Sequence, residues 1–366
     1  MLVGIDNKFA YDDMGRRQAL APGHDSVLFF DVSDAARPRQ IASLPLENSV
    51  VGPPTNLAVS ADGHLALIAS SLHSAPIEGG TGWKATPSDE LFVVDLQSGK
   101  PRLVTTVHVG SQPSGLAIAR SGHLALIANR DAKSITVLTI DGTTVRVVQT
   151  LLMGDTVTSV AISPDGTRAL ATKYGEHTVA QLAIENGRLR DLGQDLPVGT
   201  WPWNVAITPD GRLALVNNQG KNAASSGNAC MVSVIDLAAT PARVVQHVTV
   251  GDGPEGLAIS PRGDTAVTTN LNGSYDAPKD AWYHHARGQA MPLHIVGNAV
   301  TAGSPIEVGA FPEGTAFSPN GDYVYVGNFA SKTLSVLRVD PAFGLVDTHR
   351  DIALPGPPAS LRLTSS

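Results

Sequence analysis

The sequence predicts an all-β fold, a seven-bladed β-propeller with four antiparallel strands in each blade. Three observations predict it. A phrase of about ten residues recurs seven times, most copies are followed by three further short apolar strands, and no segment shows convincing helical periodicity. The copies begin 44 to 59 residues apart, and self-similarity at such a period is typical of arrays of supersecondary units.

The recurring phrase is predicted to form the innermost strand of each blade. Its clearest copies are PEGLAISPRG from Pro254 and PEGTAFSPNG from Pro312. An Asp-Gly or Asn-Gly turn follows in most copies and favours a hairpin, because these residues accept positive φ. The second strand reads HLALIAN or DYVYVGN, the third SITVLTI or TLSVLRV, and the fourth VVQHVTVG. The other copies begin at Pro54, Pro113, Val157, Pro202 and Pro358.

The two ends of the chain are predicted to complete one blade together. The copy from Pro358 stops after a single strand, whereas the N-terminal MLVGIDN matches the second strand of other copies. We therefore expect the C-terminal strand to pair with the N-terminal strands, which closes the ring and leaves no open sheet edge. Residues 1–366 then form one propeller domain.

Composition narrows the function classes. The net charge is -7, the pI is about 5.8 and no block of like charge is present. An acidic chain lacks the basic track that binds phosphate backbones, so nucleic acid is an unfavoured partner. No apolar run approaches the roughly 18 residues of a membrane span. The single cysteine, Cys230, excludes an internal disulfide and a cysteine-based zinc site.

The N-terminal stretch bears on the compartment. MLVGIDN reads as a strand from residue 2, which suggests that a preceding signal peptide has been removed. We therefore expect a periplasmic or secreted protein, with a cytoplasmic location left open.

The stretch DYVYVGNFASKTLSVLRVD, with PEGTAFSPNG before it, resembles the YVTN-repeat seven-bladed propellers. These group with lactonase-type propellers related to 6-phosphogluconolactonase of the cycloisomerase kind. The resemblance covers the whole chain and implies the propeller fold. It also implies a lactonase-like activity. The family includes periplasmic members with other roles, and the shared residues build the blade rather than a catalytic site.

Insertions point to a site at one face of the ring. The loop between strands two and three of a blade returns to the face where the inner strand begins, conventionally the top. Four of these loops are long, and loops on a rigid scaffold often carry binding residues. They are expected to form a wall or lid around the channel mouth, or a protein-contact surface. They span Lys8–Asp25, Leu72–Asp89, Gln219–Ala229 and Leu271–Met291.

Two glutamates are the leading catalytic candidates. Glu255 and Glu313 occupy equivalent positions on adjacent inner strands, so both should approach the channel. Two carboxylates in a partly desolvated channel raise one pKa, which suits a general acid or base. They are equally able to ligate a divalent cation such as Ca²⁺ or Mg²⁺. The alternative is that each only accepts hydrogen bonds from a neighbouring loop.

Cations and amides at the strand ends are candidate partners of these glutamates. Lys8, Arg130 and Lys173 follow second strands and suit an anionic or polyhydroxy ligand, with Lys8 or Arg130 stabilising an oxyanion; the alternative is an exposed rim charge. Asparagines recur at these ends because they cap loops. We list as substrate-binding candidates Asn7, Asn56, Asn204, Asn218, Asn270 and Asn328.

Histidines and aromatics gather in the expected top-face loops. His284 is a further catalytic candidate. His285 and Tyr283 beside it are binding candidates, as is His73 of the second insertion. Trp201 and Trp203 are placed to stack on a sugar, or they pack the loops down. A zinc or copper site would have to be assembled from several loops, with a glutamate added. Its histidines would be His24, His73 and His284 or His285.

The leading functional hypothesis is a lactonase-like enzyme, a hydrolase or a lyase or isomerase using acid–base chemistry on a small oxygen-rich molecule. The alternative is a non-catalytic periplasmic propeller that binds a ligand, or a protein through its long loops. Single-strand nucleic-acid binding ranks third, because the chain is acidic.

Overall fold

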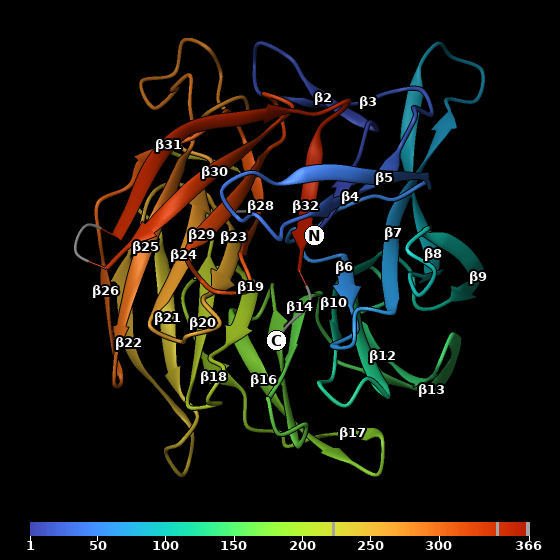
Figure 1. Cartoon of the computed structure of the whole chain (residues 1–366), viewed down its shortest axis with the longest axis vertical. Coiled ribbons are helices and arrows are strands. Elements are labelled where there is room, and N and C mark those ends of the chain that lie inside the picture. Colours follow the sequence, from blue (N-terminus) through green and yellow to red (C-terminus); the bar gives the residue numbers. More distant parts are fainter. Residues whose placement is uncertain (222–223, 342–343, 364–366) are drawn as a thin grey trace.

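A computed structural model describes residues 1–221, 224–341 and 344–363. Residues 222–223 of the expected insertion Gln219–Ala229, and the last three of the copy from Pro358, lie outside this range. Every regular element of the described chain is a β-strand, and no helix in it is long and apolar enough to cross a membrane. The strands form seven blades in a ring (Figure 1), which confirms the predicted fold class.

The first four blades follow the predicted order from the channel outward. Blade one contains β32 (Pro358–Arg362), β1 (Leu2–Ile5), β4 (Ser26–Asp31) and β5 (Arg39–Pro45). Blade two contains β6 (Leu57–Val59), β7 (Leu65–Pro76), β8 (Trp83–Asp95) and β9 (Arg102–His108). Blade three contains β10 (Pro113–Ile118), β11 (Leu124–Asn129), β12 (Ser134–Asp141) and β13 (Thr144–Leu152). Blade four contains β14 (Val157–Ile162), β15 (Arg168–Lys173), β16 (Thr178–Glu185), β17 (Arg188–Asp191) and β18 (Leu196–Pro197).

The last three blades repeat this plan. Blade five contains β19 (Pro202–Ile207), β20 (Leu213–Asn218), β21 (Met231–Asp236) and β22 (Arg243–Thr249). Blade six contains β23 (Pro254–Ile259), β24 (Thr265–Asn270), β25 (Gln289–Val296), β26 (Ala299–Ala302) and β27 (Ile306–Glu307). Blade seven contains β28 (Pro312–Phe317), β29 (Tyr323–Asn328), β30 (Thr333–Asp340) and β31 (Gly344–Ala353).

The ring closes as the sequence predicted. The C-terminal strand β32 pairs antiparallel with β1, with Val3 opposite Leu361, and Figure 1 shows β32 close to the labelled N-terminus. Val3 and Leu361 then pack with Val336 of blade seven. Closure therefore joins the first and last parts of the chain through both backbone pairing and buried apolar contacts.

A recurring turn fixes where each inner strand ends. In blade four the Ser163 hydroxyl accepts a hydrogen bond from the Arg168 amide at 3.0 Å and donates one to Asp165 at 2.5 Å. Gly166 completes the turn with a φ of +71°, which costs glycine no steric clash. The same hydroxyl-centred turn recurs at Ser60, Thr208 and Ser318. These turns lie on the face of the ring that is opposite the starts of the inner strands.

The core lies between neighbouring blades. Leu126 and Val137 of blade three, for example, pack against Val160 and Leu182 of blade four. Burying one such side chain contributes about 1.5–3 kcal/mol. Because each blade is clamped on both faces, the starts of the inner strands are held rigidly around the channel.

The insertions are built differently from one another. The first contains a hairpin of β2 (Phe9–Tyr11) and β3 (Arg17–Ala19). The second, expected as a loop over Leu72–Asp89, instead extends β7 and β8, with Pro76 still paired to Trp83. This insertion is a paired extension of the two strands because its backbone N–H and C=O groups then form hydrogen bonds with each other and need no other partners. The blade-six insertion is irregular between β24 and β25.

Candidate functional site

A cavity of about 360 Å³ lies at the top mouth of the channel. Its wall includes Trp203, Glu255 and Glu313, which occupy equivalent positions near the starts of β19, β23 and β28. Three successive blades thus bring these side chains to one space. The other residues of its wall are Asp6, Phe9, Tyr11, Gly15, Arg17, Val50, Val51, Gly52, Arg130, Phe311, Phe329 and Ala359.

The hairpin of β2 and β3 contributes one side of this cavity through Phe9, Tyr11, Gly15 and Arg17. It is tied to the blade-six insertion, because the Lys279 amide donates to the Asp13 carbonyl at 3.0 Å and their side chains form an ion pair at 2.7 Å. Two insertions from opposite ends of the sequence therefore meet beside the mouth.

Gly15 allows the hairpin and the blade-six insertion to lie close together. Its φ is +68°, and a Cβ placed on it would lie 2.1 Å from the Asp276 carbonyl oxygen. Both the left-handed backbone and the close approach require glycine here.

Aromatic rings line the cavity below the hairpin. The Tyr11 ring centroid lies 5.2 Å from that of Phe311 and 5.4 Å from that of Tyr275. Phe311 in turn lies 5.6 Å from Phe329. Tilted ring pairs at these separations are favourable, and the rings of Tyr11, Phe311 and Phe329 form an apolar part of the cavity wall.

Glu255 is a buried carboxyl with two fixed donors. The indole N–H of Trp203 donates to Oε2 at 2.5 Å, and the amide of Gln219 donates to Oε1 at 2.8 Å. Only 5% of the residue is exposed. Burial raises its pKa to about 8, although the Trp203 hydrogen bond opposes the shift.

Glu313 differs from Glu255 in having no fixed partner. No hydrogen bond from the described residues reaches its carboxyl, and it is only partly buried by its surface area. Burial within the cavity raises its pKa well above the usual value, and the nearby Glu255 carboxyl raises it further. The pair therefore shares protons at higher pH than two isolated glutamates would.

Two cations belong to the described wall, the exposed Arg17 and the less exposed Arg130. Arg130 lies beside the aromatic rings of Trp203 and Tyr174. Its guanidinium carbon lies 5.3 Å from the Trp203 ring centroid and 6.0 Å from that of Tyr174, a cation–π arrangement. Its Nε is buried without a hydrogen-bond partner, and no ion pair joins it to the described residues. Burial lowers its pKa to about 10, so it stays charged at neutral pH.

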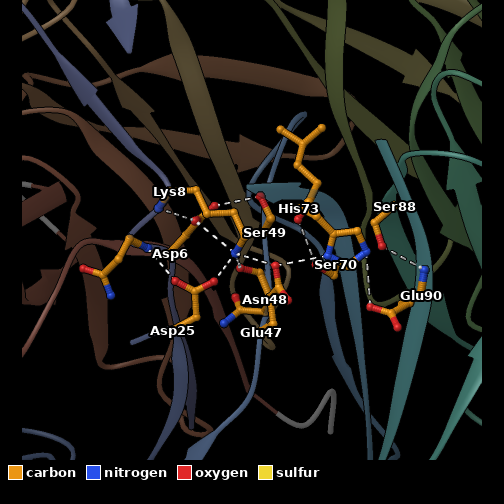
Figure 2. Close-up of polar contacts among 12 residues, drawn as sticks. Asp6, Lys8, Asp25, Glu47, Asn48, Ser49, Ser70, His73, Ser88 and Glu90 are labelled. Atoms are coloured by element: carbon orange, nitrogen blue, oxygen red, sulfur yellow. Dashed lines mark hydrogen bonds and ion pairs between the residues drawn. The ribbon is translucent and has the colours of Figure 1, made fainter. Parts of the chain in front are cut away.

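Lys8 lies elsewhere, inside a cluster of ion pairs (Figure 2). Its ammonium contacts Asp25, lies 3.6 Å from Asp6 and donates to the Asn48 carbonyl at 2.7 Å. The side chain is 2% exposed and does not line the cavity. Asp6 belongs to both this cluster and the cavity wall. It lines the cavity, lies near Lys8 and accepts a hydrogen bond from the Ser49 hydroxyl at 2.9 Å. Lys8 therefore holds the acids beneath the hairpin rather than facing the mouth.

Lys173 and the asparagine candidates are also absent from the described cavity wall. Lys173 pairs with Asp195 at 2.8 Å and with Glu176 at 2.5 Å. Most of the amides serve the backbone or neighbouring hydroxyls, as in loop capping. Those with such contacts are Asn7, Asn56, Asn218 and Asn328, whereas the buried side chain of Asn270 lacks a described partner and Asn204 keeps one unpaired nitrogen.

The histidine and outer aromatic candidates do not line the cavity either. His73 lies between Glu47 and Glu90, at 3.1 and 3.5 Å. His285 contacts the Asn272 carbonyl at 2.9 Å, and Tyr283 stacks edge-on with exposed Trp282, which precedes His284 by two positions. Trp201 packs on Tyr174. No three His, Cys, Asp or Glu side chains of the described chain are grouped to hold a metal ion, so His24, His73, His284 and His285 do not come together.

Sequence reasoning missed several wall residues. Asp6 and Phe329 stand at second-strand ends, which the repeat had already marked as facing the top. Phe311 directly precedes the inner strand of blade seven. Tyr11 and Arg17 lie in an insertion without a repeat counterpart, so only its folded position could reveal them.

Comparison with known proteins bears on the fold. No family model and no curated protein matches the chain. The periplasmic gluconolactonase of Pseudomonas aeruginosa superposes with a TM-score of 0.69 at 20% identity, with 99% of this chain and 97% of that one covered. A candidate 6-phosphogluconolactonase of Bacteroides uniformis gives 0.72 at 16% identity, covering 97% and 96%.

A third neighbour has a different name. Hydrazine synthase of Kuenenia stuttgartiensis superposes with a TM-score of 0.67 at 19% identity, covering 88% of this chain and 92% of that one. At such identities the likeness shows the propeller fold alone, and one fold carries many functions. The chain is thus a propeller whose structural neighbours include gluconolactonases.

Proposed function

We propose that the protein is a lactonase-like hydrolase that opens a small, oxygen-rich cyclic ester in the top cavity. The observation that carries the proposal is one cavity containing two carboxyls of raised pKa, Glu255 and Glu313, and the guanidinium of Arg130. The gluconolactonase among its structural neighbours supports the same reaction class.

Glu255 is assigned the role of general base. The hydrogen bonds from Trp203 and Gln219 stabilise its carboxylate, so it ionises before Glu313 and is able to take a proton from a water molecule in the cavity. The resulting hydroxide attacks the ester carbon, and the carbonyl oxygen becomes an oxyanion. Arg130 lacks a described ion-pair partner and is placed to stabilise that charge.

Glu313 is assigned the role of general acid. Its pKa is raised well above the usual value by burial and by the Glu255 carboxyl, so it keeps its proton when Glu255 is ionised, and no described hydrogen bond holds it. When the tetrahedral intermediate collapses, the ring C–O bond breaks and the leaving alkoxide takes the Glu313 proton. The product is a hydroxy acid, and proton exchange with solvent returns Glu255 to its base form and Glu313 to its acid form. Trp203 and the Phe311 side of the cavity would contact the apolar faces of a sugar ring.

Lys8, Lys173 and His284 receive no step in this reaction because they lie outside the cavity wall. No metal ion is required by the described steps. Non-catalytic ligand binding at the same cavity is the competing function, and turnover distinguishes the two.

The test is a pH-stat assay on a panel of sugar and aliphatic lactones, with and without divalent cations. We expect acid release from at least one sugar lactone, and a loss of about 10²–10⁴-fold in Glu313→Gln, the usual contribution of a general acid. The matched control is Glu185→Gln, an exposed carboxyl paired with Arg190 on blade four, which should keep full activity. Binding of a lactone without turnover would show that the protein is a non-catalytic binding propeller. Full activity in Glu313→Gln would show that Glu313 takes no part in the reaction.

A further inference from the structure

A second cavity, of about 300 Å³, lies further along the channel. It is lined by the inner strands of all seven blades and shares no described residue with the wall of the top cavity. The top cavity is lined near the starts of these strands, whereas this one reaches their ends and the following turns at Pro164, Pro209 and Pro261. It is therefore a separate compartment, called here the lower channel.

One arginine interrupts the small side chains of the lower channel. In the closing strand β32, Arg362 occupies the position that is alanine in every other inner strand. Its Nε donates to the Leu57 carbonyl of blade two at 2.9 Å. The equivalent residues are Ala58, Ala117, Ala161, Ala206, Ala258 and Ala316.

The Arg362 charge is uncompensated within the described chain. No described carboxylate pairs with it, and its two terminal nitrogens have no described partner. None of the described lining residues is Asp or Glu, and the only other charged one, Arg120, is also a cation. Burial lowers the pKa of Arg362 to about 10, so it remains charged at neutral pH. Arg362 is partly buried by its surface area, and a cation without a counter-ion in a partly enclosed channel attracts anions.

Three neutral groups around the lower channel are also unpartnered. Asn204 is 2% exposed and its Nδ2 donor has no hydrogen bond, and the hydroxyls of Thr55 and Thr315 are likewise buried and unpaired. Thr315 belongs to β28 and Thr55 lies just before β6, the inner strands that contact β32 on either side. Unpaired buried polar groups are rare in folded proteins, and here all three can donate.

We propose that the lower channel binds a small oxyanion, of the phosphate, sulfate or short carboxylate class, through the guanidinium of Arg362. With Nε held by Leu57, the two terminal nitrogens present a planar pair of donors, which matches two oxygens of such an anion. The hydroxyls of Thr55 and Thr315 and the amide of Asn204 provide further donors for the remaining oxygens. The site goes beyond the proposed hydrolysis and uses none of its residues.

The test uses isothermal titration calorimetry of the whole protein with inorganic phosphate at constant ionic strength. We expect one phosphate per chain, and at least about a tenfold weaker affinity in Arg362→Ala, in line with the loss of a charged hydrogen bond. This variant restores the alanine of the other six inner strands, so folding should persist. Arg212→Ala, an exposed arginine with no described ion pair, is the matched control and should bind like the unchanged protein.

Two further measurements keep the proposal falsifiable. Thr315→Val retains the shape and the arginine and should weaken phosphate binding by several fold, which guards against misfolding of the first variant. A crystal structure of the protein soaked in phosphate should show the anion between the Arg362 terminal nitrogens. The proposal is overturned by equal phosphate affinity in Arg362→Ala and the unchanged protein, by no measurable heat, or by water alone at that place. Lactone turnover should be the same in Arg362→Ala, so the two proposals fail independently.

Discussion

The indole N–H of Trp203 donates to the buried carboxyl of Glu255, and the face of the same indole lies under the guanidinium of Arg130. One residue of blade five thus contacts both a carboxyl and a cation of the cavity wall. It stabilises the ionised form of Glu255 against the effect of burial, which is the larger of the two. The balance between these influences determines the pH range of the carboxyl pair.

Replacing Trp203 with phenylalanine should move that range. Trp203→Phe removes a donor to the carboxylate, so the pKa of Glu255 should rise further above about 8. Because the proposed reaction needs Glu255 ionised, the acid limb of the rate profile should shift upward by about one pH unit. The pH dependence of kcat/KM checks this. Trp201→Phe, which alters a ring packed on Tyr174 outside the cavity wall, should leave the limb in place, and an equal shift in both variants would refute the assignment.

Stability should fall as pH rises, because of Glu255. Its folded-state pKa of about 8 exceeds the ordinary 4.5, so the folded chain binds more protons than the unfolded chain between these values. The free energy of unfolding therefore decreases across that interval, by at most about 5 kcal/mol from this group. Glu313 acts in the same direction.

Urea unfolding at several pH values measures this effect. Glu255→Gln cannot ionise, so its stability should decline less steeply between pH 5 and about 8 than that of the unchanged protein. Parallel curves for the two proteins would show that Glu255 is not protonated in the folded state.

Lys8 should be needed for folding stability rather than for catalysis. Lys8→Met leaves the buried carboxyls of Asp6 and Asp25 without their cation, and breaking a buried ion pair in this way costs about 3–5 kcal/mol. The free energy of urea unfolding measures the loss. Lys100→Met, at an exposed turn residue, should change stability by less than about 0.5 kcal/mol. A similar small change in Lys8→Met would contradict the role of the cluster.

The hairpin of β2 and β3 should depend on Gly15. Gly15→Ala places a Cβ against the Asp276 carbonyl oxygen and strains a left-handed backbone, so the hairpin should separate from the blade-six insertion. Limited proteolysis should then cut between residues 11 and 17 several times faster. Gly99→Ala supplies the control, since its φ of +69° is nearly the same but nothing lies within 4 Å of the added atom. Cleavage of the hairpin at the same rate in both variants would show that the close contact at Gly15 does not hold the hairpin in place.

The sequence predicted the position of the carboxyl pair better than it predicted the position of Lys8. Glu255 and Glu313 could be placed together because they occupy equivalent positions in a repeat, and equivalent positions on neighbouring blades lie side by side. Lys8 also follows a second strand, yet its side chain is taken up by Asp25, an acid at the far end of the same insertion. The repeat could not reveal that contact, because insertions have no counterpart in other blades.

The sequence by itself determined the blade number, the strand order and the closure of β32 on β1, because hairpin turns and alternating apolar strands are local patterns repeated along the chain. Only the tertiary structure decided which side chains line the top cavity and the lower channel. Those choices depend on contacts between distant segments, such as Asp13 with Lys279 and Arg362 with Leu57. Each contact forms only when the ring has closed, because the two segments that it joins lie far apart in the sequence.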